Sequence, residues 1–285
     1  MAKAFVTRFA PSPTGRLHLG HAYSALLAYT AAKEAGGRFL LRIEDIDAVR
    51  CHPEFVEAIY EDLAWLGLAW ETPVRRQSEH FADYAAALGQ LRAMELLYPC
   101  FCTRKDIARE IKESAAAPHG PAGALYPGTC RSLSEAAQKE KMASGALFAW
   151  RLDAAKAARQ LEPPLTFDES GSTLPVDPLL LGDVVLARKD TPASYHLAVV
   201  VDDHLQGVSD VIRGEDLYHA THVQRLLQTL LGYEAPRYRH HPLLVGADGK
   251  RFAKRDLSLM LQALRESGVA PQDIPALCER HLPDA

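Results

Sequence analysis

The chain has 285 residues, 48% of them hydrophobic and 24% charged, so it can bury a large core and carry one large domain with a smaller module. It contains no run of about 18 uncharged apolar residues, so neither membrane insertion nor secretion is expected. Five cysteines, an odd number in a chain that needs no disulfides to fold, indicate a cytoplasmic protein. The formal net charge of -4 excludes a wholly basic surface but allows a local patch that binds RNA.

The beginning of the chain predicts a strand, a loop, a helix and a second strand. Residues 4–9 have an apolar strand pattern, which turn-forming residues interrupt at 10–15. Residues 20–35 are small or apolar and favour a helix, which a pair of glycines ends. Residues 38–43 favour the second strand. This order is typical of a βαβ unit, so we expect a parallel sheet.

The rest of the chain predicts a loop-rich middle and a second set of sheet elements. The expected helices are 53–66, 80–97 and 221–231, and the expected strands are 195–201 and 211–213. The run 195–201 is continuously apolar, which favours a buried strand. The stretch 112–128 is rich in Ala, Pro and Gly and indicates a loop. About thirty residues follow Lys254, enough for two short helices.

Two histidines lie where the first loop meets the first helix. His18 and His21 are one turn apart at a helix start, where backbone N–H groups and the helix dipole attract phosphate. They suit charge stabilisation in adenylyl transfer, because the attacking carboxylate is already ionised and needs no general base. Gly20 leaves room for a nucleotide base to lie against the backbone. An isolated H-x-G-H pattern is equally compatible with a structural or chance origin.

Four motifs in the correct order resemble the glutamyl-tRNA synthetases. They are RFAPSPTGRLHLGH at 8–21, RIEDID at 42–47, YHLAVVVDDH at 195–204 and VIRGED at 211–216. The resemblance runs from Thr7 to about Asp256. It implies an α/β fold with a Rossmann-like class I aminoacyl-tRNA synthetase catalytic domain, which makes glutamyl-adenylate from L-glutamate and ATP with Mg²⁺.

The resemblance implies a glutamate pocket of five residues. Arg8 and Arg213 would hold the side-chain carboxylate, Glu44 would hold the α-amine, and Ser12 and Tyr195 would complete the pocket. The residue types fit, because arginine binds a carboxylate with two parallel hydrogen bonds. The alternative for Arg8 and Glu44 is an ion pair at the strand ends.

The resemblance assigns the contacts with ATP to His18, Gly20, His21, Asp216 and Lys254. Of these, His18, His21 and Lys254 would be catalytic and Asp216 would meet the ribose. Lys254 matches the second lysine of the family's K-L-S-K-R loop, which clamps the departing pyrophosphate. The loop here reads KRFAKR, so Arg251 replaces the first lysine and Ala253 removes a serine hydroxyl. Out of context, such a run is typical of a solvated surface.

Three cysteines around the loop-rich middle predict a structural zinc site. Cys100, Cys102 and Cys130 offer three thiolates, and one oxygen or nitrogen donor would complete a tetrahedron. The C-x-C and Y-x-x-x-C spacings resemble the glutamyl-Q tRNA(Asp) synthetases, short paralogues of glutamyl-tRNA synthetases. This resemblance implies Tyr126 as the fourth ligand. His119 is the rival ligand, and unliganded buried thiols are the other alternative.

The length of the chain after the ATP loop adds to the resemblance to these short paralogues. Ordinary glutamyl-tRNA synthetases continue with a large helical domain that reads the anticodon, whereas only residues 256–285 follow here. The implied reaction is activation of glutamate without tRNA, followed by transfer to a hydroxyl of queuosine in the anticodon loop of tRNA(Asp). Two alternatives stay open: a shortened enzyme that charges a tRNA 3′ end, and a non-catalytic zinc-bearing RNA-binding paralogue.

These interpretations divide the chain into four segments of an expected monomer. The segments are 1–98, the first half of the catalytic domain; 99–190, an inserted zinc-bearing acceptor-type module; 191–256, the second half with the ATP loop; and 257–285, a short helical tail without an anticodon-binding domain. RNA would bind through local basic groups. The candidates are Arg75, Arg76, Arg104, Lys105, Arg237, Arg239, Lys250 and Arg255.

Overall fold

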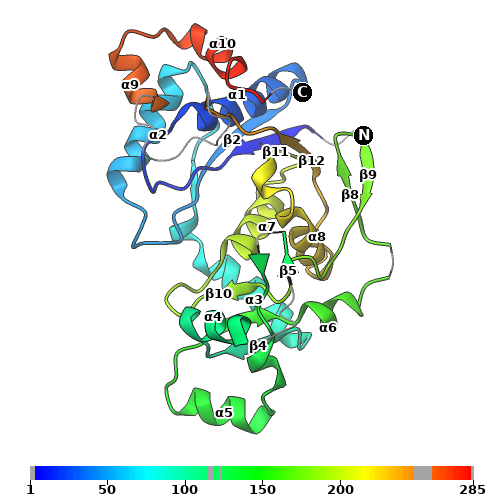
Figure 1. The fold of residues 1–285 in the computed structure, drawn as a ribbon. Coiled ribbons are helices and arrows are strands. Elements are labelled where there is room, and N and C mark those ends of the chain that lie inside the picture. Colours follow the sequence, from blue (N-terminus) through cyan, green and yellow to red (C-terminus); the bar gives the residue numbers. More distant parts are fainter. Residues whose placement is uncertain (1–3, 114–118, 122, 163, 247–258, 284–285) are drawn as a thin grey trace.

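The computed structural model describes residues 4–113, 119–121, 123–162, 164–246 and 259–283. Figure 1 shows an elongated molecule, with a parallel sheet at one end and smaller antiparallel sheets at the other. Both chain termini lie at the end that carries the parallel sheet. Within the described ranges, none of the helices has the length and apolar character that crossing a bilayer requires.

A parallel sheet dominates the upper end of the molecule in Figure 1. Its strands are β1 (Val6–Phe9), β2 (Arg38–Ile43), β3 (Arg75–Arg76), β11 (Asp210–Gly214) and β12 (Arg237–His241). β1 pairs with β2, β2 with β3 and β11 with β12, all in parallel. The two groups meet where the N–H of Ser209 donates to the carbonyl of Val6 over 2.9 Å. The order β3-β2-β1-β11-β12 is that of a doubly wound fold and confirms the predicted βαβ opening.

An antiparallel hairpin extends this sheet beyond β12. β8 (Thr166–Glu169) and β9 (Ser172–Pro175) pair with each other, and β8 also pairs with β12 where Glu169 lies opposite Tyr238. The hairpin belongs to the segment 99–190, which we expected as an insert. Two strands of that segment therefore belong to the sheet that contains β11 and β12.

Helix α1 (Leu19–Glu34) packs on the parallel sheet with a face of small residues. Its buried positions include Ala22, Ala25, Ala28 and Ala32, spaced three or four residues apart, so the helix can lie close to the strands. The same core takes in α2 (Pro53–Trp65) and the last two helices. These are α9 (Leu261–Glu266) and α10 (Ile274–Glu279), joined by a 3₁₀ turn at Pro271–Asp273. The predicted pair of short terminal helices is confirmed.

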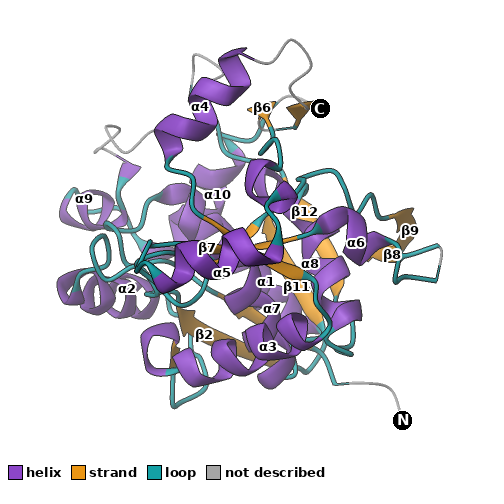
Figure 2. Ribbon diagram, turned by 90° about the horizontal axis from the view of Figure 1, so that it is seen from below, coloured by secondary structure: helices purple, strands orange, loops and turns teal. Residues whose placement is uncertain are grey.

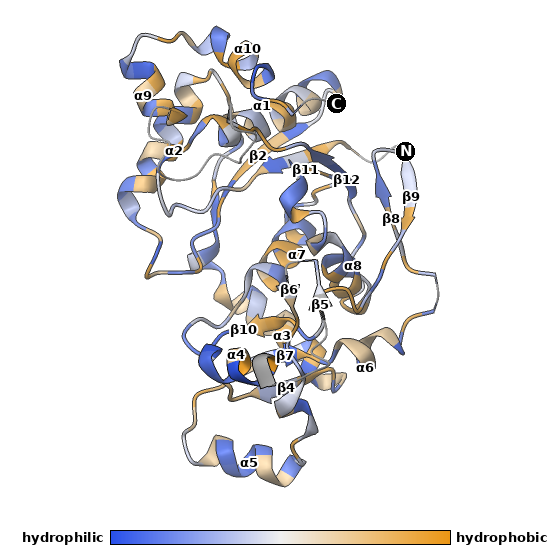
Figure 3. Cartoon of the chain, in the orientation of Figure 1, coloured by the Kyte–Doolittle hydropathy of each residue, from blue (hydrophilic) through white to orange (hydrophobic). Residues whose placement is uncertain are grey.

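A second core surrounds α7 (Tyr195–Leu205), where the sequence prediction was wrong. We expected a strand at 195–201, but these residues begin a helix that packs against α3 (Phe81–Ala93) and α8 (Ala220–Leu230). All residues from Leu197 to Asp203 are buried, so the helix is enclosed on every side. Figure 3 shows α7 as a largely hydrophobic helix in the middle of the molecule. A fully buried helix carries the same apolar run as a buried strand, which explains the error.

The lower end of the molecule is built around a small antiparallel sheet of order β10-β7-β4. Its strands are β4 (Leu97–Cys100), β7 (Ala149–Leu152) and β10 (Val185–Ala187). The helices of this part are α4 (Arg104–Glu113), α5 (Glu135–Ala143) and α6 (Ala154–Ala158). β5 (His119–Gly120) and β6 (Gly123–Ala124), strands of two residues each, pair antiparallel inside the predicted loop. In Figure 2 the parallel strands run through the middle of the molecule, with helices around them.

Candidate active site

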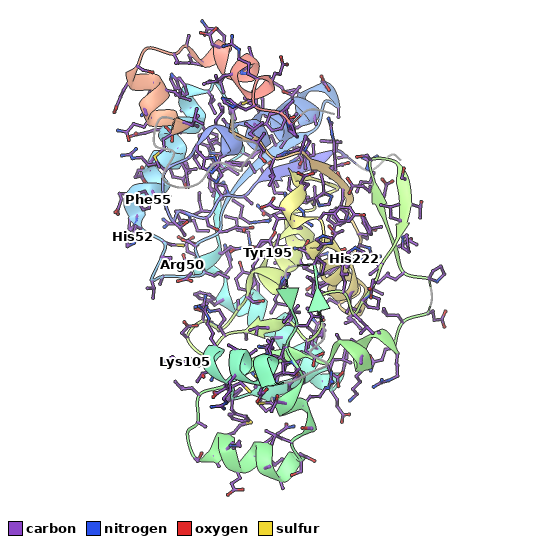
Figure 4. The ribbon with its side chains drawn as sticks, viewed as in Figure 1. Arg50, His52, Phe55, Lys105, Tyr195 and His222 are labelled. Carbon is purple, nitrogen blue, oxygen red and sulfur yellow. The ribbon has the colours of Figure 1, made fainter. Side chains whose placement is uncertain are left out.

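A cavity of about 550 Å³ opens at the carboxyl ends of β1, β2 and β11. Ligands of doubly wound sheets bind at this edge. Every predicted site residue of the catalytic domain that the structure describes lines the cavity: Arg8, Ser12, His18, Gly20, His21, Glu44, Tyr195, Arg213 and Asp216. Figure 4 labels Tyr195, which begins α7 below the parallel sheet. Residues far apart in the sequence are thus brought to one place.

The two histidines cap the first turn of α1 reciprocally. The N–H of Gly20 donates to Nδ1 of His18 over 3.1 Å, and the N–H of His18 donates to Nδ1 of His21 over 3.1 Å. An N–H needs a lone pair to accept it, so each neutral ring carries its own proton on Nε2. Burial lowers the pKa of His18, which favours this neutral form. The pair can therefore act as two Nε2–H donors, with ring centroids 3.8 Å apart.

Gly20 packs closely against the ring of His18. A Cβ atom at this position would lie 3.1 Å from Cε1 of the His18 ring. We expected Gly20 to make room for a nucleotide base, and its place on the cavity wall agrees with that expectation. The structure adds a local reason, because a Cβ here would crowd the His18 ring that caps the helix.

Arg8 is held in place by Asp203. Nε and Nη2 of Arg8 donate to the Asp203 carboxylate over 3.0 and 3.4 Å, and Nη1 of Arg42 donates to the same carboxylate over 2.8 Å. Burial alone would raise the pKa of Asp203, but the two guanidinium groups outweigh it, so this pKa lies below its usual range. Asp203 therefore stays ionised and fixes Arg8 at the cavity wall.

Glu44 receives its hydrogen bond from Arg42. Nη2 of Arg42 donates to Oε1 of Glu44 over 3.2 Å. Burial raises the pKa of Glu44, and the guanidinium groups of Arg42 and Arg8 act against that shift. The alternative that we weighed for Arg8, an ion pair with Glu44, differs from the pairing found, because Arg8 is bonded to Asp203.

The neighbouring carboxylate of Asp202 organises a buried group behind the cavity. Nε of Arg75 donates to it over 2.7 Å, Nε2 of Gln77 over 2.7 Å and the hydroxyl of Tyr84 over 3.0 Å. Asp202 is completely buried, so its charge depends on these partners for compensation. Arg75, one of the candidate RNA contacts, is therefore engaged in the protein interior.

Arg213 has four hydrogen-bond partners around the cavity. Nη1 donates to Gln224 over 2.8 Å, Nη2 donates to Thr221 over 2.8 Å and to the carbonyl of Leu217 over 3.2 Å, and Nε donates to His240 over 3.1 Å. Burial raises the pKa of the nearby Tyr195 hydroxyl, which stays protonated and can donate. The residues around Arg213 did not stand out in the sequence.

Asp216 lies directly over Gly214 at the end of β11. A Cβ at position 214 would come within 2.6 Å of Oδ1 of Asp216 and 2.8 Å of Cδ2 of Leu243. A larger residue there would require these side chains to shift, and both Gly214 and Asp216 line the cavity. The wall that we assigned to the ribose is thus closely packed against the backbone.

Lys254 lies outside the described residues, as do Lys250, Arg251, Ala253 and Arg255. The first described residues after this gap lie next to His18 and Leu17. Met260 forms a β-bridge with His18, and the N–H of Leu261 donates to the carbonyl of Leu17 over 3.0 Å. The residues from Met260 onward are therefore anchored beside His18 at the cavity wall.

The three cysteines predicted to bind metal come together in the lower part of the molecule. The sulfur atoms of Cys100, Cys102 and Cys130 all lie within 4.8 Å of one another. The hydroxyl oxygen of Tyr126 is 3.4 Å from Sγ of Cys100 and 3.6 Å from Sγ of Cys102. The N–H of Phe101 donates to Sγ of Cys130 over 3.3 Å, as it would to a thiolate. Three sulfurs and one oxygen of this kind fit a tetrahedral zinc site. The side chain of His119, the rival ligand, lies outside the described part of the chain.

The fold and the cavity agree with the known proteins that this chain resembles. Residues 4–281 match the family described as tRNA synthetases class I (E and Q), catalytic domain, so the chain is a class I synthetase catalytic domain. It is 44% identical to the glutamyl-Q tRNA(Asp) synthetase of Rhodobacter capsulatus over 275 residues, which are 95% of this chain and 99% of that protein. The chain belongs to the glutamyl-Q tRNA(Asp) synthetase family and is an enzyme of the class I ligase type. The predicted family and fold class are confirmed.

Two further relatives define the extent of the similarity. A glutamyl-Q tRNA(Asp) synthetase of Nocardia farcinica is 46% identical over 270 residues, covering 95% of this chain and 82% of that protein. The crystal structure of a glutamate tRNA ligase from Elizabethkingia meningosepticum in complex with its amino acid is 30% identical, with a TM-score of 0.74. That match covers 88% of this chain and 52% of the ligase chain.

Proposed function

We propose that this enzyme activates L-glutamate with ATP, bound with Mg²⁺, in the absence of tRNA, and then transfers glutamate to the queuosine base of tRNA(Asp). The observation that carries the activation step is the pair of buried arginines, Arg8 and Arg213, in one cavity with His18 and His21. The acceptor is supported by the relatives at 44% and 46% identity, which are named for glutamyl-Q and tRNA(Asp).

In the proposed first step, the α-carboxylate of glutamate attacks the α-phosphorus of ATP. A mixed anhydride forms and pyrophosphate leaves. His18 and His21 would donate Nε2–H groups to the developing phosphate charge, and Lys254 would hold the leaving pyrophosphate. Asp216 would meet the ribose.

In the same step Arg8 and Arg213 would bind the side-chain carboxylate and Glu44 the ammonium group, with Ser12 and Tyr195 completing the pocket. In the second step a queuosine hydroxyl attacks the carbonyl carbon of glutamyl-adenylate. An ester forms, AMP leaves with the bonding electron pair, and the hydroxyl proton is released.

The activation step is tested by ATP–pyrophosphate exchange without tRNA. Glutamate should support exchange, and glutamine should support it at least about 100-fold less well, because a neutral amide brings no negative charge to the guanidinium groups of Arg8 and Arg213. Glutamate analogues that lack only the α-amine provide the control for Glu44. Equal exchange with glutamate and glutamine would show that the cavity does not select a carboxylate.

We also propose a structural zinc ion held by Cys100, Cys102, Tyr126 and Cys130. About one zinc per chain should survive purification, and Cys100→Ser or Cys130→Ser should release it and lower the thermal midpoint of unfolding. Cys51→Ser is the matched control, because Cys51 lies outside the cluster and should keep the metal. Metal analysis that finds no zinc in fresh, unchelated protein would refute this site. Glutamate activation should partly survive in the zinc-free variants.

The four segments and the monomeric state remain predictions. The cytoplasmic location is a proposal that rests on the odd number of cysteines in the sequence. The described part of segment 257–285 forms the two short helices, and both pack on the core of the parallel sheet.

A further inference from the structure

Three side chains joined by hydrogen bonds, those of Glu169, His240 and Arg213, connect the hairpin of β8 and β9 to the cavity. Arg213 and His240 lie opposite each other on β11 and β12, and Nε of Arg213 is 3.1 Å from Nε2 of His240. Nδ1 of His240 is 2.7 Å from Oε2 of Glu169, and the backbone N–H of His240 donates to Oε1 of Glu169 over 2.8 Å. The side chain of His240 is 3% exposed and that of Glu169 is 16% exposed. Little solvent competes with these bonds.

The direction of the hydrogen bonds fixes the proton on His240. The Nε group of a guanidinium can only donate, so Nε2 of His240 must accept. The neutral ring then carries its proton on Nδ1 and donates it to Glu169. Burial, together with the positive charge of Arg213, lowers the pKa of His240 to about 4, so the ring is neutral near pH 7. The Glu169 carboxylate, the neutral His240 imidazole and the Arg213 guanidinium are thus joined in series by hydrogen bonds.

These hydrogen bonds matter because they use most of the N–H groups of Arg213 and leave few of them for a ligand. A guanidinium carries five N–H groups. One of them, on Nε, is used by His240, one on Nη1 by Gln224, and both on Nη2 by Thr221 and Leu217. The bonds to described residues thus leave one N–H, on Nη1, for a ligand in the cavity that Arg213 lines.

Arg8 differs in this respect. It uses one N–H on Nε and one on Nη2 for Asp203, and the described part of the chain leaves three of its five for a ligand. Arg8 can therefore grip a carboxylate with two parallel bonds, whereas Arg213 can add a single donor. The contribution of a single donor depends on its direction, and the partners of Arg213 set that direction.

We propose that Glu169 and His240 are positioning residues that aim Arg213 at the side-chain carboxylate of the amino acid and so set the preference for glutamate. This inference rests on the proposed function. Glu169 belongs to β8 in segment 99–190, so that segment would contribute to amino-acid selection through the hairpin that joins the catalytic sheet.

The test is pyrophosphate exchange with purified full-length variants at saturating ATP. Glu169→Gln keeps the size of the side chain and removes its charge. We expect it to raise KM for glutamate about tenfold, with kcat and KM for ATP changed by less than about twofold, and to lower the preference for glutamate over glutamine. A purely structural role would not separate KM for glutamate from the other parameters in this way.

Two substitutions of His240 distinguish its hydrogen bond with Arg213 from its hydrogen bond with Glu169. Glutamine at this position can place an oxygen near the former Nε2 and accept from Arg213, whereas asparagine can only reach the side of Glu169. His240→Gln should therefore retain more glutamate affinity than His240→Asn, by about fivefold or more. The opposite order would overturn the proposal, because it would mean that His240 does not act through Arg213.

A matched control is the ion pair of Asp210 and Arg237, which lies at the other end of β11 and β12 from Arg213 and His240. Asp210 accepts two hydrogen bonds from Arg237, and its side chain is about as buried as that of Glu169. Asp210→Asn should leave KM for glutamate unchanged. If the unchanged enzyme shows no exchange with glutamate, the proposed function fails. If that enzyme is active and Glu169→Gln keeps its KM, only the positioning role fails.

Discussion

Replacing Arg213 with alanine is expected to reduce glutamate-dependent pyrophosphate exchange by at least about two orders of magnitude, which corresponds to about 2.7 kcal/mol of transition-state stabilisation. Arg213 is 95% buried, and its charge faces a cavity with only one other arginine among the described lining residues. Little water reaches this position to replace the lost charge–carboxylate contact, so the loss should be large. The measurement is kcat/KM for glutamate at saturating ATP.

The controls for this experiment address folding and charge. Arg213→Ala removes the guanidinium donor to Gln224, Thr221 and His240, so its thermal midpoint of unfolding must be measured as well. Arg213→Lys keeps a charge but loses the fixed fork, so we expect an intermediate loss. Arg237→Ala removes a largely exposed arginine at the far end of β12 and should leave exchange intact. An Arg213→Ala enzyme within about fivefold of the unchanged protein would show that Arg8 alone selects the carboxylate.

The elements that the sequence predicted well are those set by neighbours in the chain. Residues 20–35 have good helix formers followed by two glycines, and α1 ends there as expected. His18 and His21 meet because they are one turn apart at the start of that helix. The apolar run 195–201 lacks such local information, because continuous burial suits a strand and a helix equally, and α7 is helical.

The partners that position the site could not be read from spacing. Arg8 and Asp203 are 195 residues apart, and His240 and Glu169 are 71 apart. Asp203 lies in a motif that we quoted, YHLAVVVDDH, but its role becomes visible only when α7 is a helix that ends near β1. Glu169 lies in a segment that we assigned to another module. Only the pairing of β8 with β12 brings it to His240.

The candidate RNA-binding residues fall into different groups in the structure. Arg75 donates to buried Asp202, and Arg237 donates to Asp210, so both have structural partners. Arg104 and Lys105 start α4, the helix that follows Cys102, and are exposed; Lys105 is labelled in Figure 4. Because the net charge is -4, attraction for RNA must come from such local groups and will fall steeply with salt.

Transfer of glutamate to tRNA(Asp) is expected to depend entirely on queuosine and to be independent of the 3′ end. The expectation follows from membership of the glutamyl-Q tRNA(Asp) synthetase family and from the proposed activation site, which we expect to form glutamyl-adenylate before RNA binds. A queuosine hydroxyl has the same nucleophilic atom as a ribose hydroxyl, so the adenylate can be attacked by either. What selects between them is the RNA that the enzyme seats over the cavity.

The experiment compares labelled glutamate transfer to tRNA(Asp) from cells able or unable to make queuosine, each with its 3′-terminal nucleotide intact or removed. Removing that nucleotide eliminates the ordinary acceptor without oxidising the diol of queuosine. We expect equal labelling of both queuosine-containing samples and background labelling of both queuosine-free samples. Labelling of queuosine-free tRNA(Glu) that stops when its 3′-terminal nucleotide is removed would identify a conventional 3′-end charging enzyme instead. Exchange with glutamate but no labelling of any tRNA would leave activation standing and refute the acceptor, because the adenylate forms before the acceptor is needed.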